Sequence, residues 1–196
     1  MMSEHKFEMR DFEKPSFLFI LEDIVKGFLG GLLLYNPFIK TFGIKGNERV
    51  LDFGCGGGIS SRCIAKKLTK GGFLTCVDTS IFWMKKAKKR LRKYNNVEFK
   101  TGDIRKLDIP DSSYDIVSIV HVIHDIEPEL RQATVNSLAG KLKEGGRLFI
   151  IEPTKKSHGM SIEEIRTLMN NAGLVETNNT IKKSSYTGEF TKSDTG

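Results

Sequence analysis

The stretch RVLDFGCGGGISSRCIAKKL, residues 49–68, places an apolar run, an aspartate and four glycines within five residues ahead of a helical pattern. The run 49–54 predicts a short buried strand, and residues 58–72 predict a helix. Glycine in a regular element costs stability, so such a cluster needs a reason. The usual reason is that a group other than protein comes close to the backbone. The stretch therefore predicts a ligand-binding turn between a strand and a helix.

Strand and helix patterns alternate from Lys45 onward, which favours a parallel sheet with helices on both faces. The last two strand patterns have no helix between them, so they form a hairpin and one of them runs antiparallel. The expected fold is α/β: a doubly wound, mostly parallel seven-stranded sheet with one antiparallel C-terminal strand in a terminal β-hairpin, plus N-terminal helices. The predicted strands are 49–54, 73–80, 96–103, 114–123, 145–153, 174–185 and 186–193, and the predicted helices after Lys45 are 58–72, 81–95, 127–142 and 161–173.

The glycine turn itself narrows the choice of ligand. A P-loop for nucleoside triphosphates requires a Gly-Lys-Ser/Thr ending, and GGGISS contains no lysine. A dinucleotide fingerprint requires G-x-G-x-x-G. From Gly54 the third glycine position falls on Ile59, and from Gly56 it falls on Ser61. Three ligands commonly compete for such a turn: nucleoside triphosphates, dinucleotides and S-adenosylmethionine. The first two are disfavoured here, so S-adenosylmethionine remains.

The remaining pattern, Asp52-x-Gly54-x-Gly56-x-Gly58 after a Val-Leu strand, resembles the motif of class I (Rossmann-like) S-adenosylmethionine-dependent methyltransferases. The resemblance continues along nearly the whole chain. It includes VDTS at 77–80, GDIRKLDIPDSSYDIV at 102–117, LKEGGRLFIIEP at 142–153 and IEEIRTLMNNAGL at 162–174. Five ordered segments make this likeness far more specific than a single glycine loop. It implies a methyltransferase that uses S-adenosyl-L-methionine as cofactor.

The resemblance also implies which residues contact the cofactor. Asp78 would accept hydrogen bonds from both ribose hydroxyls, and Asp103 and Ile104 would lie beside the adenine. Each acid also has a structural alternative, since Asp103 could cap a turn and Asp52 could bond the amides of the loop. The full expected set is Asp52, Gly54, Gly56, Gly58, Asp78, Thr79, Asp103, Ile104 and Val120.

Catalysis is less well defined by the sequence. Methyl transfer from a sulfonium depends mainly on positioning, and a general base is needed only if the acceptor must lose a proton early. His121 and His124 in VHVIHDIEP are the candidate catalytic residues, because they lie at the end of the fourth predicted strand, where the methyl group should point. The alternative is that one histidine is packed and hydrogen-bonded while the other lies on a loop. Glu152 and His158 are also expected near the mouth of the site. No metal site is predicted.

The acceptor is expected to be a small molecule. Nucleic-acid amine methyltransferases carry Asn/Asp-Pro-Pro-aromatic after the fourth strand, and here that place reads HVIHDI. Cytosine-C5 enzymes use a Pro-Cys nucleophile, and no cysteine here follows a proline. The apolar segment 16–38 predicts helices that cover the acceptor site, which divides the chain into an N-terminal helical lid, 1–44, and a cofactor-binding domain, 45–196. An amphipathic or aromatic acceptor, such as a quinone or lipid precursor, would suit such a lid.

Composition and charge leave two other functions open. The formal net charge is +7, and seven of the nine residues 85–93 are basic. A basic helix can bind RNA, although a solvated outer face explains the same pattern and no aromatic residues interrupt this run. A methyltransferase-like protein that binds the cofactor without turnover is the other alternative. Three cysteines, no cationic leader and no apolar run long enough to span a bilayer predict a cytoplasmic protein without a transmembrane anchor.

Overall fold

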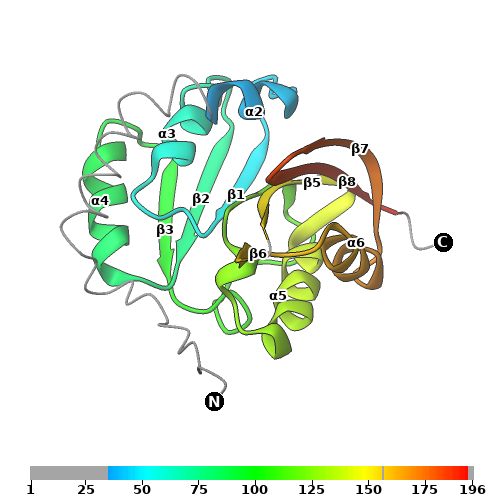
Figure 1. Cartoon of the computed structure of the whole chain (residues 1–196). Coiled ribbons are helices and arrows are strands. Elements are labelled where there is room, and N and C mark those ends of the chain that lie inside the picture. The colour runs from blue at the N-terminus through cyan, green and yellow to red at the C-terminus, as the bar shows by residue number, and fades with distance from the viewer. Residues whose placement is uncertain (1–34, 156, 194–196) are drawn as a thin grey trace, which may run out of the picture.

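The computed structural model describes residues 35–155 and 157–193, and the element labels are those of Figure 1. The strands are β1 Arg49–Phe53, β2 Phe73–Asp78, β3 Val97–Thr101, β4 Tyr114–Val120, β5 Leu142–Lys155, β6 His158–Gly159, β7 Leu174–Lys182 and β8 Ser185–Lys192. The helices are α2 Asn36–Thr41, α3 Ile59–Ala65, α4 Ile81–Leu91, the 3-10 turn η2 Ile123–Asp125, α5 Pro128–Lys141 and α6 Ile162–Asn171.

The strands form one sheet in the order β3-β2-β1-β4-β5-β8-β7, and the two-residue β6 pairs with the end of β5. Strands β1 to β5 are parallel, whereas β8 is antiparallel to both of its neighbours, β5 and β7. Within this seven-strand path β8 is therefore the one reversed strand. The predicted doubly wound sheet with a terminal hairpin is confirmed. The chain reverses its winding direction between β1 and β4, and in such sheets the ligand lies at that point, outside the carboxyl ends of the strands.

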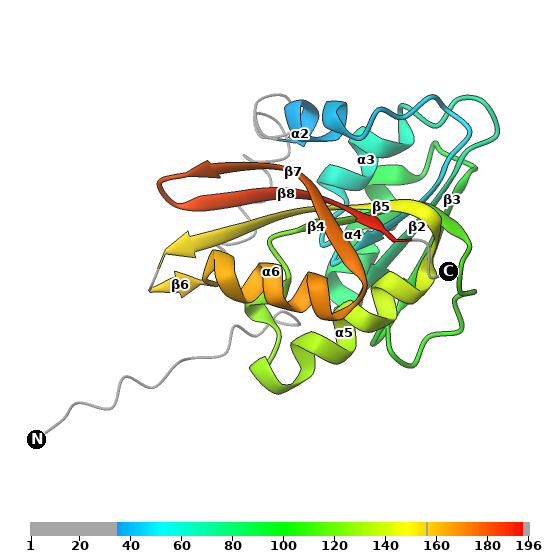
Figure 2. The ribbon, with the colours of Figure 1, turned by 90° about the vertical axis from the view of Figure 1, so that its right-hand side faces the viewer.

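The two faces of the sheet carry separate apolar clusters because side chains alternate along each strand. Val50 packs with residues of α2, α3 and α4, whereas its neighbour Leu51 packs on the opposite face with residues of α5 and α6. Figures 1 and 2 show these two groups of helices on opposite sides of the sheet. The connection from β3 to β4 contains no helix, as predicted, and Ile104 and Ile109 of this loop pack into the α5–α6 cluster.

The described part of the predicted lid, residues 35–44, is integrated into the core. Phe42 stacks on Phe149 of β5 with ring centroids 4.2 Å apart, and Phe38 contacts Phe42 edge-on at 4.9 Å. The Arg147 guanidinium fastens the end of α2 by donating to the Phe42 carbonyl at 2.6 Å. Residues 1–34, which hold most of the predicted lid, lie outside the described residues. The lid therefore stays a prediction for that segment.

Several predicted boundaries are wrong, since the predicted helix 58–72 forms only over Ile59–Ala65 and the predicted helix 81–95 ends at Leu91. The starts of two later helices follow local rules. Ser161 caps α6 by accepting the Glu164 N–H at 3.0 Å, as the capping-box pattern predicts. Pro128 is the first residue of α5, where its missing N–H costs nothing. The predicted fourth strand, 114–123, is too long, because β4 ends at Val120 and His121 has a left-handed φ of 58°. That conformation ends the strand and directs the chain into η2.

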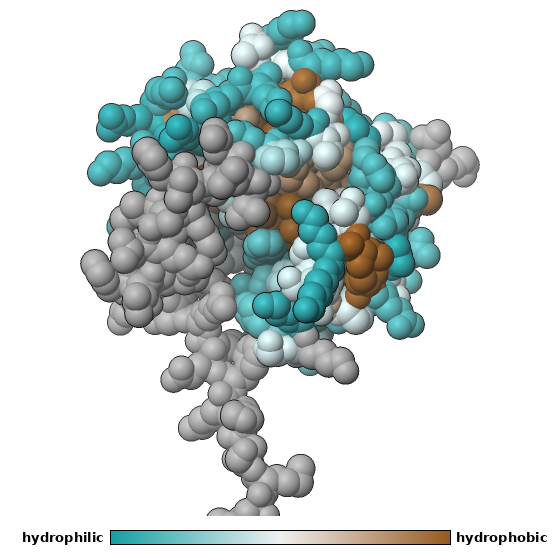
Figure 3. Space-filling view, turned by 45° about the horizontal axis from the view of Figure 1, so that its top comes forward, coloured by the Kyte–Doolittle hydropathy of each residue, from teal (hydrophilic) through white to brown (hydrophobic). Residues whose placement is uncertain are grey.

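Where Figure 3 shows described residues, the face is largely hydrophilic, with brown areas near the middle and at the right. Among the described residues, the large hydrophobic side chains that are exposed are Ile81, Val175 and Ile181. The three cysteines, Cys55, Cys63 and Cys76, are buried thiols that form no disulfide.

Candidate functional site

The loops that follow β1 and β4 meet at the winding reversal. A Cβ atom added to Gly54 would lie 2.3 Å from Val122 Cγ2, so this glycine is required by close packing against the loop after β4. Gly54 and Cys55 both donate their N–H groups to the Val77 carbonyl of β2, at 2.8 and 3.0 Å. The glycine turn is thus fixed between its two neighbouring strand ends.

The three motif glycines all have left-handed φ values, 66° at Gly54, 51° at Gly56 and 77° at Gly58, but they face different surroundings. A Cβ at Gly58 would lie 2.9 Å from Leu91 of α4, so this glycine permits close helix packing. A Cβ at Gly56 would meet no heavy atom of the described residues within 4 Å. Gly56 is therefore the position where the turn presents bare backbone to open space, as close approach of a ligand requires.

Asp52 lies beneath the turn rather than on its surface. It is 1% exposed, and its Oδ2 atom accepts hydrogen bonds from the hydroxyls of Ser60 at 2.9 Å and Ser61 at 2.6 Å. Burial raises the pKa of this carboxyl above its ordinary value, against the opposing effect of the two hydroxyl donors. These contacts join the end of β1 to the first turn of α3 through two hydroxyls, whereas the structural alternative named the amides of the loop.

Asp78 ends β2 and is partly exposed beside the turn. Its two oxygens accept backbone N–H groups from Gly56 at 2.7 Å and from Ser80 at 2.9 Å. Thr79, the next residue, is exposed. Asp78 therefore touches the same backbone segment that Gly56 leaves open, and these two predicted cofactor residues lie together.

The three remaining predicted cofactor residues come from β3 and β4. Asp103 follows β3, and Arg105 binds both of its carboxylate oxygens, which holds the pKa of Asp103 below its ordinary value. Ile104 is buried in the core at 2% exposure, so its backbone rather than its side chain is available to a ligand. Val120, the last residue of β4, is half-buried.

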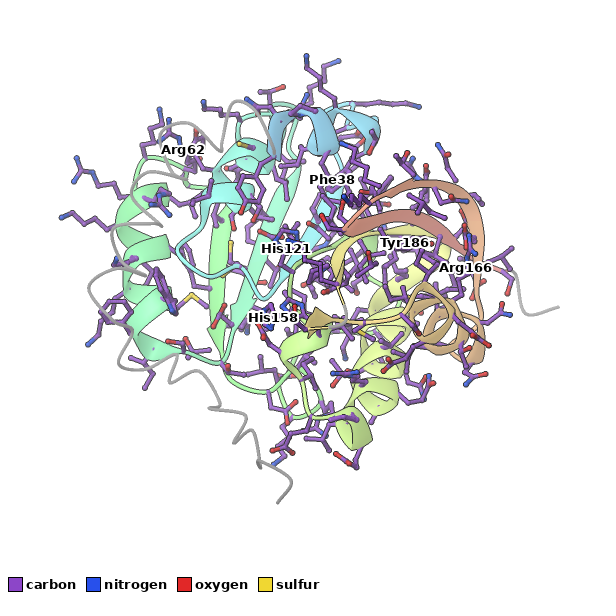
Figure 4. The ribbon with its side chains drawn as sticks, viewed as in Figure 1. Phe38, Arg62, His121, His158, Arg166 and Tyr186 are labelled. Atoms are coloured by element: carbon purple, nitrogen blue, oxygen red, sulfur yellow. The ribbon has the colours of Figure 1, made fainter. Side chains whose placement is uncertain are left out.

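The two candidate catalytic histidines have different surroundings. His121 is exposed at the end of β4, and its left-handed backbone is held by an N–H donated to the Ile151 carbonyl of β5 at 2.8 Å. The His124 side chain is 4% exposed, and its Nδ1 atom lies 2.6 Å from Oε2 of the buried Glu152. Figure 4 shows His121 and His158 near the middle of the molecule, between the two helical halves. The donor atoms of His124, Asp125 and His158 all lie within 4.8 Å of one another.

Two arginines support this region, and the sequence did not single them out. Arg131 of α5 donates to the carbonyls of His124 and Ile126, each at 3.0 Å, and to the Glu164 carboxylate at 2.6 Å. Arg90 of α4 donates to the Gly57 carbonyl within the glycine turn. In the sequence Arg90 is one of seven basic residues in a run, so nothing distinguishes its role from that of its neighbours.

Comparison with known proteins agrees with this geometry. Residues 50–146 match the protein family described as methyltransferase domain. A demethylmenaquinone methyltransferase of Tropheryma whipplei is 28% identical over 152 residues, which cover 76% of this chain and 60% of that protein. A ubiquinone/menaquinone biosynthesis C-methyltransferase UbiE of Pseudomonas putida is 28% identical over 143 residues, which cover 71% of this chain and 54% of that protein.

The crystal structure of a SAM-dependent methyltransferase from Aquifex aeolicus superposes with a TM-score of 0.72 at 20% identity, and the match covers 89% of this chain and 96% of that one. The chain belongs to the class I S-adenosylmethionine-dependent methyltransferases. The family predicted from the glycine motif is confirmed. S-adenosylmethionine is the cofactor of this family. This methyltransferase spans between 54% and 60% of the length of the two curated relatives.

Across residues 35–155 and 157–193, no helix of this methyltransferase has the length and apolar character needed to cross a bilayer.

Proposed function

We propose that this methyltransferase transfers the methyl group of S-adenosylmethionine to a ring carbon of a small aromatic acceptor of the quinol class. The observation that carries the proposal is the open backbone at Gly56 beside Asp78. Both residues lie within the segment that matches the methyltransferase domain family. The acceptor class comes from the two curated relatives, one named as a demethylmenaquinone methyltransferase and the other as a ubiquinone/menaquinone biosynthesis C-methyltransferase.

In this proposal the cofactor lies across the ends of β1 and β2. Gly56 leaves room for its methionine portion, and Asp78, already oriented by two backbone N–H groups, accepts the ribose hydroxyls. The adenine lies by Asp103 and the backbone of Ile104, with Val120 on the side of β4. Asp52 acts from beneath by fixing the turn through Ser60 and Ser61.

The reaction then needs little from the protein beyond position and one proton acceptor. A ring carbon attacks the methyl group, the C–S bond breaks, and S-adenosylhomocysteine leaves. The methylated ring carbon then loses its hydrogen as a proton and the ring oxygen is protonated again, which restores the aromatic quinol with net release of one proton. The carbon becomes nucleophilic when a neighbouring hydroxyl loses its proton, so a base is useful here. We assign this role to His121, since it is exposed at the end of β4 in a strained conformation typical of functional sites. The ring of His124 is buried and held by Glu152, which suits a positioning role.

A role in RNA methylation is less well supported. Two of the basic residues of α4 make contacts within the protein: Lys86 lies over the Phe82 and Trp83 rings at 5.2 and 4.8 Å, and Arg90 binds the glycine turn. A helix with one face packed on the protein and the other face exposed to solvent explains this basic run without RNA. Salt-sensitive retention of the protein on RNA would contradict this assignment.

The experiment is titration calorimetry with S-adenosylmethionine and S-adenosylhomocysteine, followed by transfer of a labelled methyl group to soluble naphthoquinols and benzoquinols. We expect both S-adenosylmethionine and S-adenosylhomocysteine to bind. At a concentration a hundred times its Kd, S-adenosylhomocysteine should stabilise the protein by about 2.7 kcal/mol. The product should gain one methyl group on carbon. Stabilisation by NAD without stabilisation by S-adenosylhomocysteine would refute the proposal. Cofactor binding without transfer to any quinol would favour a different acceptor or a protein that binds without turnover.

A further inference from the structure

The cluster that most needs explanation surrounds Glu152 at the end of β5. This carboxylate is fully buried. Its Oε1 atom accepts the backbone N–H groups of Val122 at 2.9 Å and Ile123 at 2.8 Å, and its Oε2 atom lies 2.6 Å from His124 Nδ1. A carboxylate can only accept, so Nδ1 carries the proton and donates it. In the neutral imidazole the lone pair of His124 therefore lies on Nε2.

That lone pair faces another acceptor. His124 Nε2 lies 3.4 Å from Asp125 Oδ2, which is longer than a charge-assisted hydrogen bond of about 2.7–2.9 Å. Two acceptors that face each other repel unless a cation lies between them. With Zn–N and Zn–O bonds of about 2.0–2.1 Å, two ligand atoms of a tetrahedral site are separated by roughly 3.3–3.4 Å. The Nε2 to Oδ2 separation fits this geometry.

His158 brings a third donor from a different element. The short β5–β6 hairpin pairs Lys155 with His158 and returns the chain to the end of β5. The His158 ring centroid lies 4.7 Å from that of His124, with the two rings at 87°. The donor atoms of His124, Asp125 and His158 lie within 4.8 Å of one another. His158 is half-buried and the Asp125 side chain is 24% exposed, so the cluster is open to solvent on one side.

We propose that His124, Asp125 and His158 bind a divalent transition-metal ion at the carboxyl ends of β4 and β5. Two imidazoles and one carboxylate select zinc, cobalt, nickel or iron over magnesium and calcium, which prefer all-oxygen sites. Glu152 acts as the outer carboxylate that fixes the tautomer and orientation of the His124 ligand, a common arrangement around protein-bound metals. This assignment replaces the sequence-based expectation that the chain has no metal site.

Three protein ligands leave at least one coordination position open, as in catalytic zinc sites. On the proposed function, this position would take the acceptor hydroxyl, whose proton is lost more easily when its oxygen binds a cation. The metal would then select acceptors that carry an oxygen atom next to the methylated carbon. Metal binding itself does not depend on which acceptor is used.

The test is a titration of the full-length, EDTA-treated protein with Co²⁺, which absorbs visible light when bound, followed by displacement with Zn²⁺. We expect one equivalent to bind. His158→Gln and Asp125→Asn should each weaken the affinity at least tenfold, and Glu152→Gln should weaken it about 10- to 100-fold through the outer shell. His121→Gln is the matched control, because it removes an exposed histidine of the same loop that lies outside the cluster, and its Co²⁺ affinity should equal that of the parent.

Each other outcome has a definite meaning. Absence of saturable binding, together with a doubly protonated His124 ring in the NMR spectrum, would show that a proton occupies the position and would overturn the proposal. Equal binding by parent, His158→Gln and Asp125→Asn would place the ion elsewhere and would also overturn it. Circular dichroism checks that each variant is folded. A parallel titration with S-adenosylhomocysteine separates failure of this proposal from failure of the proposed function.

Discussion

Gly54 and Gly56 are two residues apart in the same turn, but a methyl group added at each meets different surroundings. At Gly54 it would strike Val122 at 2.3 Å, whereas at Gly56 it would enter open space. Either alanine costs about 1–2 kcal/mol for its left-handed backbone. Overpacking should add about 1–3 kcal/mol at Gly54 only. We therefore predict that Gly54→Ala lowers the free energy of unfolding more than Gly56→Ala, and that Gly56→Ala weakens S-adenosylhomocysteine binding at least tenfold.

Urea denaturation and calorimetry measure the two effects. Gly71→Ala is the control for Gly56→Ala, because Gly71 has a similar left-handed φ of 81° and no described heavy atom within 4 Å of an added Cβ, but lies between α3 and β2. It should lose similar stability and keep its cofactor affinity. Val122→Ala should relieve part of the cost of Gly54→Ala. Equal cofactor affinity in Gly56→Ala and Gly71→Ala would show that the cofactor does not approach Gly56.

The pKa of Asp52 makes a prediction about pH. Because burial raises this pKa in the folded protein, the native state binds the Asp52 proton more tightly than the unfolded state does. Its contribution to stability is therefore lost as the pH rises from about 4, the ordinary value for aspartate, through the raised pKa. Asp52→Asn does not titrate. Its free energy of unfolding relative to the parent should rise across this window and then level off.

Urea denaturation at pH values from 4 to 8 tests this sign. Glu176→Gln is a control of opposite sign, because Arg166 lowers the pKa of Glu176 in the folded state. Stability from that pair is present above about pH 4.5 and is lost as the pH falls, so this variant should fall behind the parent as the pH rises. The effect should be small, since the pair lies on the surface. A constant difference between Asp52→Asn and the parent across the range would contradict the assignment to Asp52.

At the scale of elements, Arg131 fixes the loop after β4 to two helices. Its guanidinium reaches the carbonyls of His124 and Ile126 from α5, and Glu164 of α6 completes the set. Arg131→Lys keeps the charge but cannot present three donors in one plane. Hydrogen bonds from charged groups contribute about 1.5–3 kcal/mol each, so we expect a loss of at least 1.5 kcal/mol in the free energy of unfolding.

Arg166→Lys is the matched control for Arg131→Lys. Arg166 also binds a carboxylate through two nitrogens, with contacts to Glu176 of 2.6 and 2.9 Å, but its side chain is 44% exposed. Exposed pairs contribute about 0–1 kcal/mol. If denaturant unfolding showed equal losses for the two lysine variants, the loop contacts of Arg131 would add nothing to stability.

The order and type of the main elements could be predicted because they depend on local patterns. Buried strands such as β4 are largely apolar runs, and α6 begins with a capping serine. The end of β4 could not be predicted, because His121 and Val122 read as further strand residues and only the tertiary fold imposes the left-handed turn. The two-residue β6 was missed for a similar reason, since its pairing with β5 is too short to leave a pattern.

The residues of the candidate site also differ in whether the sequence could predict them. Gly56 was predicted because the glycine motif reports local backbone needs, and Asp78 was predicted because the family resemblance implies an acid at the end of the second strand. The contacts of His124 with Glu152, 28 residues later, and of Arg131 with Glu164, 33 residues later, join elements that are distant in the chain. Their geometry follows from the sheet order and not from spacing. Asp125 was missed because it looked like an ordinary loop acid next to a candidate histidine.

At the scale of the whole molecule, the apolar clusters of the described residues are built from elements between α2 and β8. We predict that a variant lacking residues 1–34 folds and binds S-adenosylhomocysteine, and that it no longer methylates the acceptor if the predicted lid forms the acceptor site. The cut must precede α2, because Phe38 is 5% exposed and packs on Phe42 and Phe149. Thermal unfolding, calorimetry and the labelled transfer assay measure the three properties.

A second deletion tests the boundary between core and lid. Removing residues 1–42 takes away three buried side chains, Phe38, Ile39 and Phe42, each of which contributes on the order of 2–5 kcal/mol in a packed core. That total rivals the whole stability of a typical domain, about 5–15 kcal/mol. We expect the longer deletion to unfold or to lose most of its thermal transition, and the shorter one to keep it. Full acceptor methylation by the protein that lacks residues 1–34 would show that the acceptor site lies entirely within the core, and the lid prediction would then be wrong.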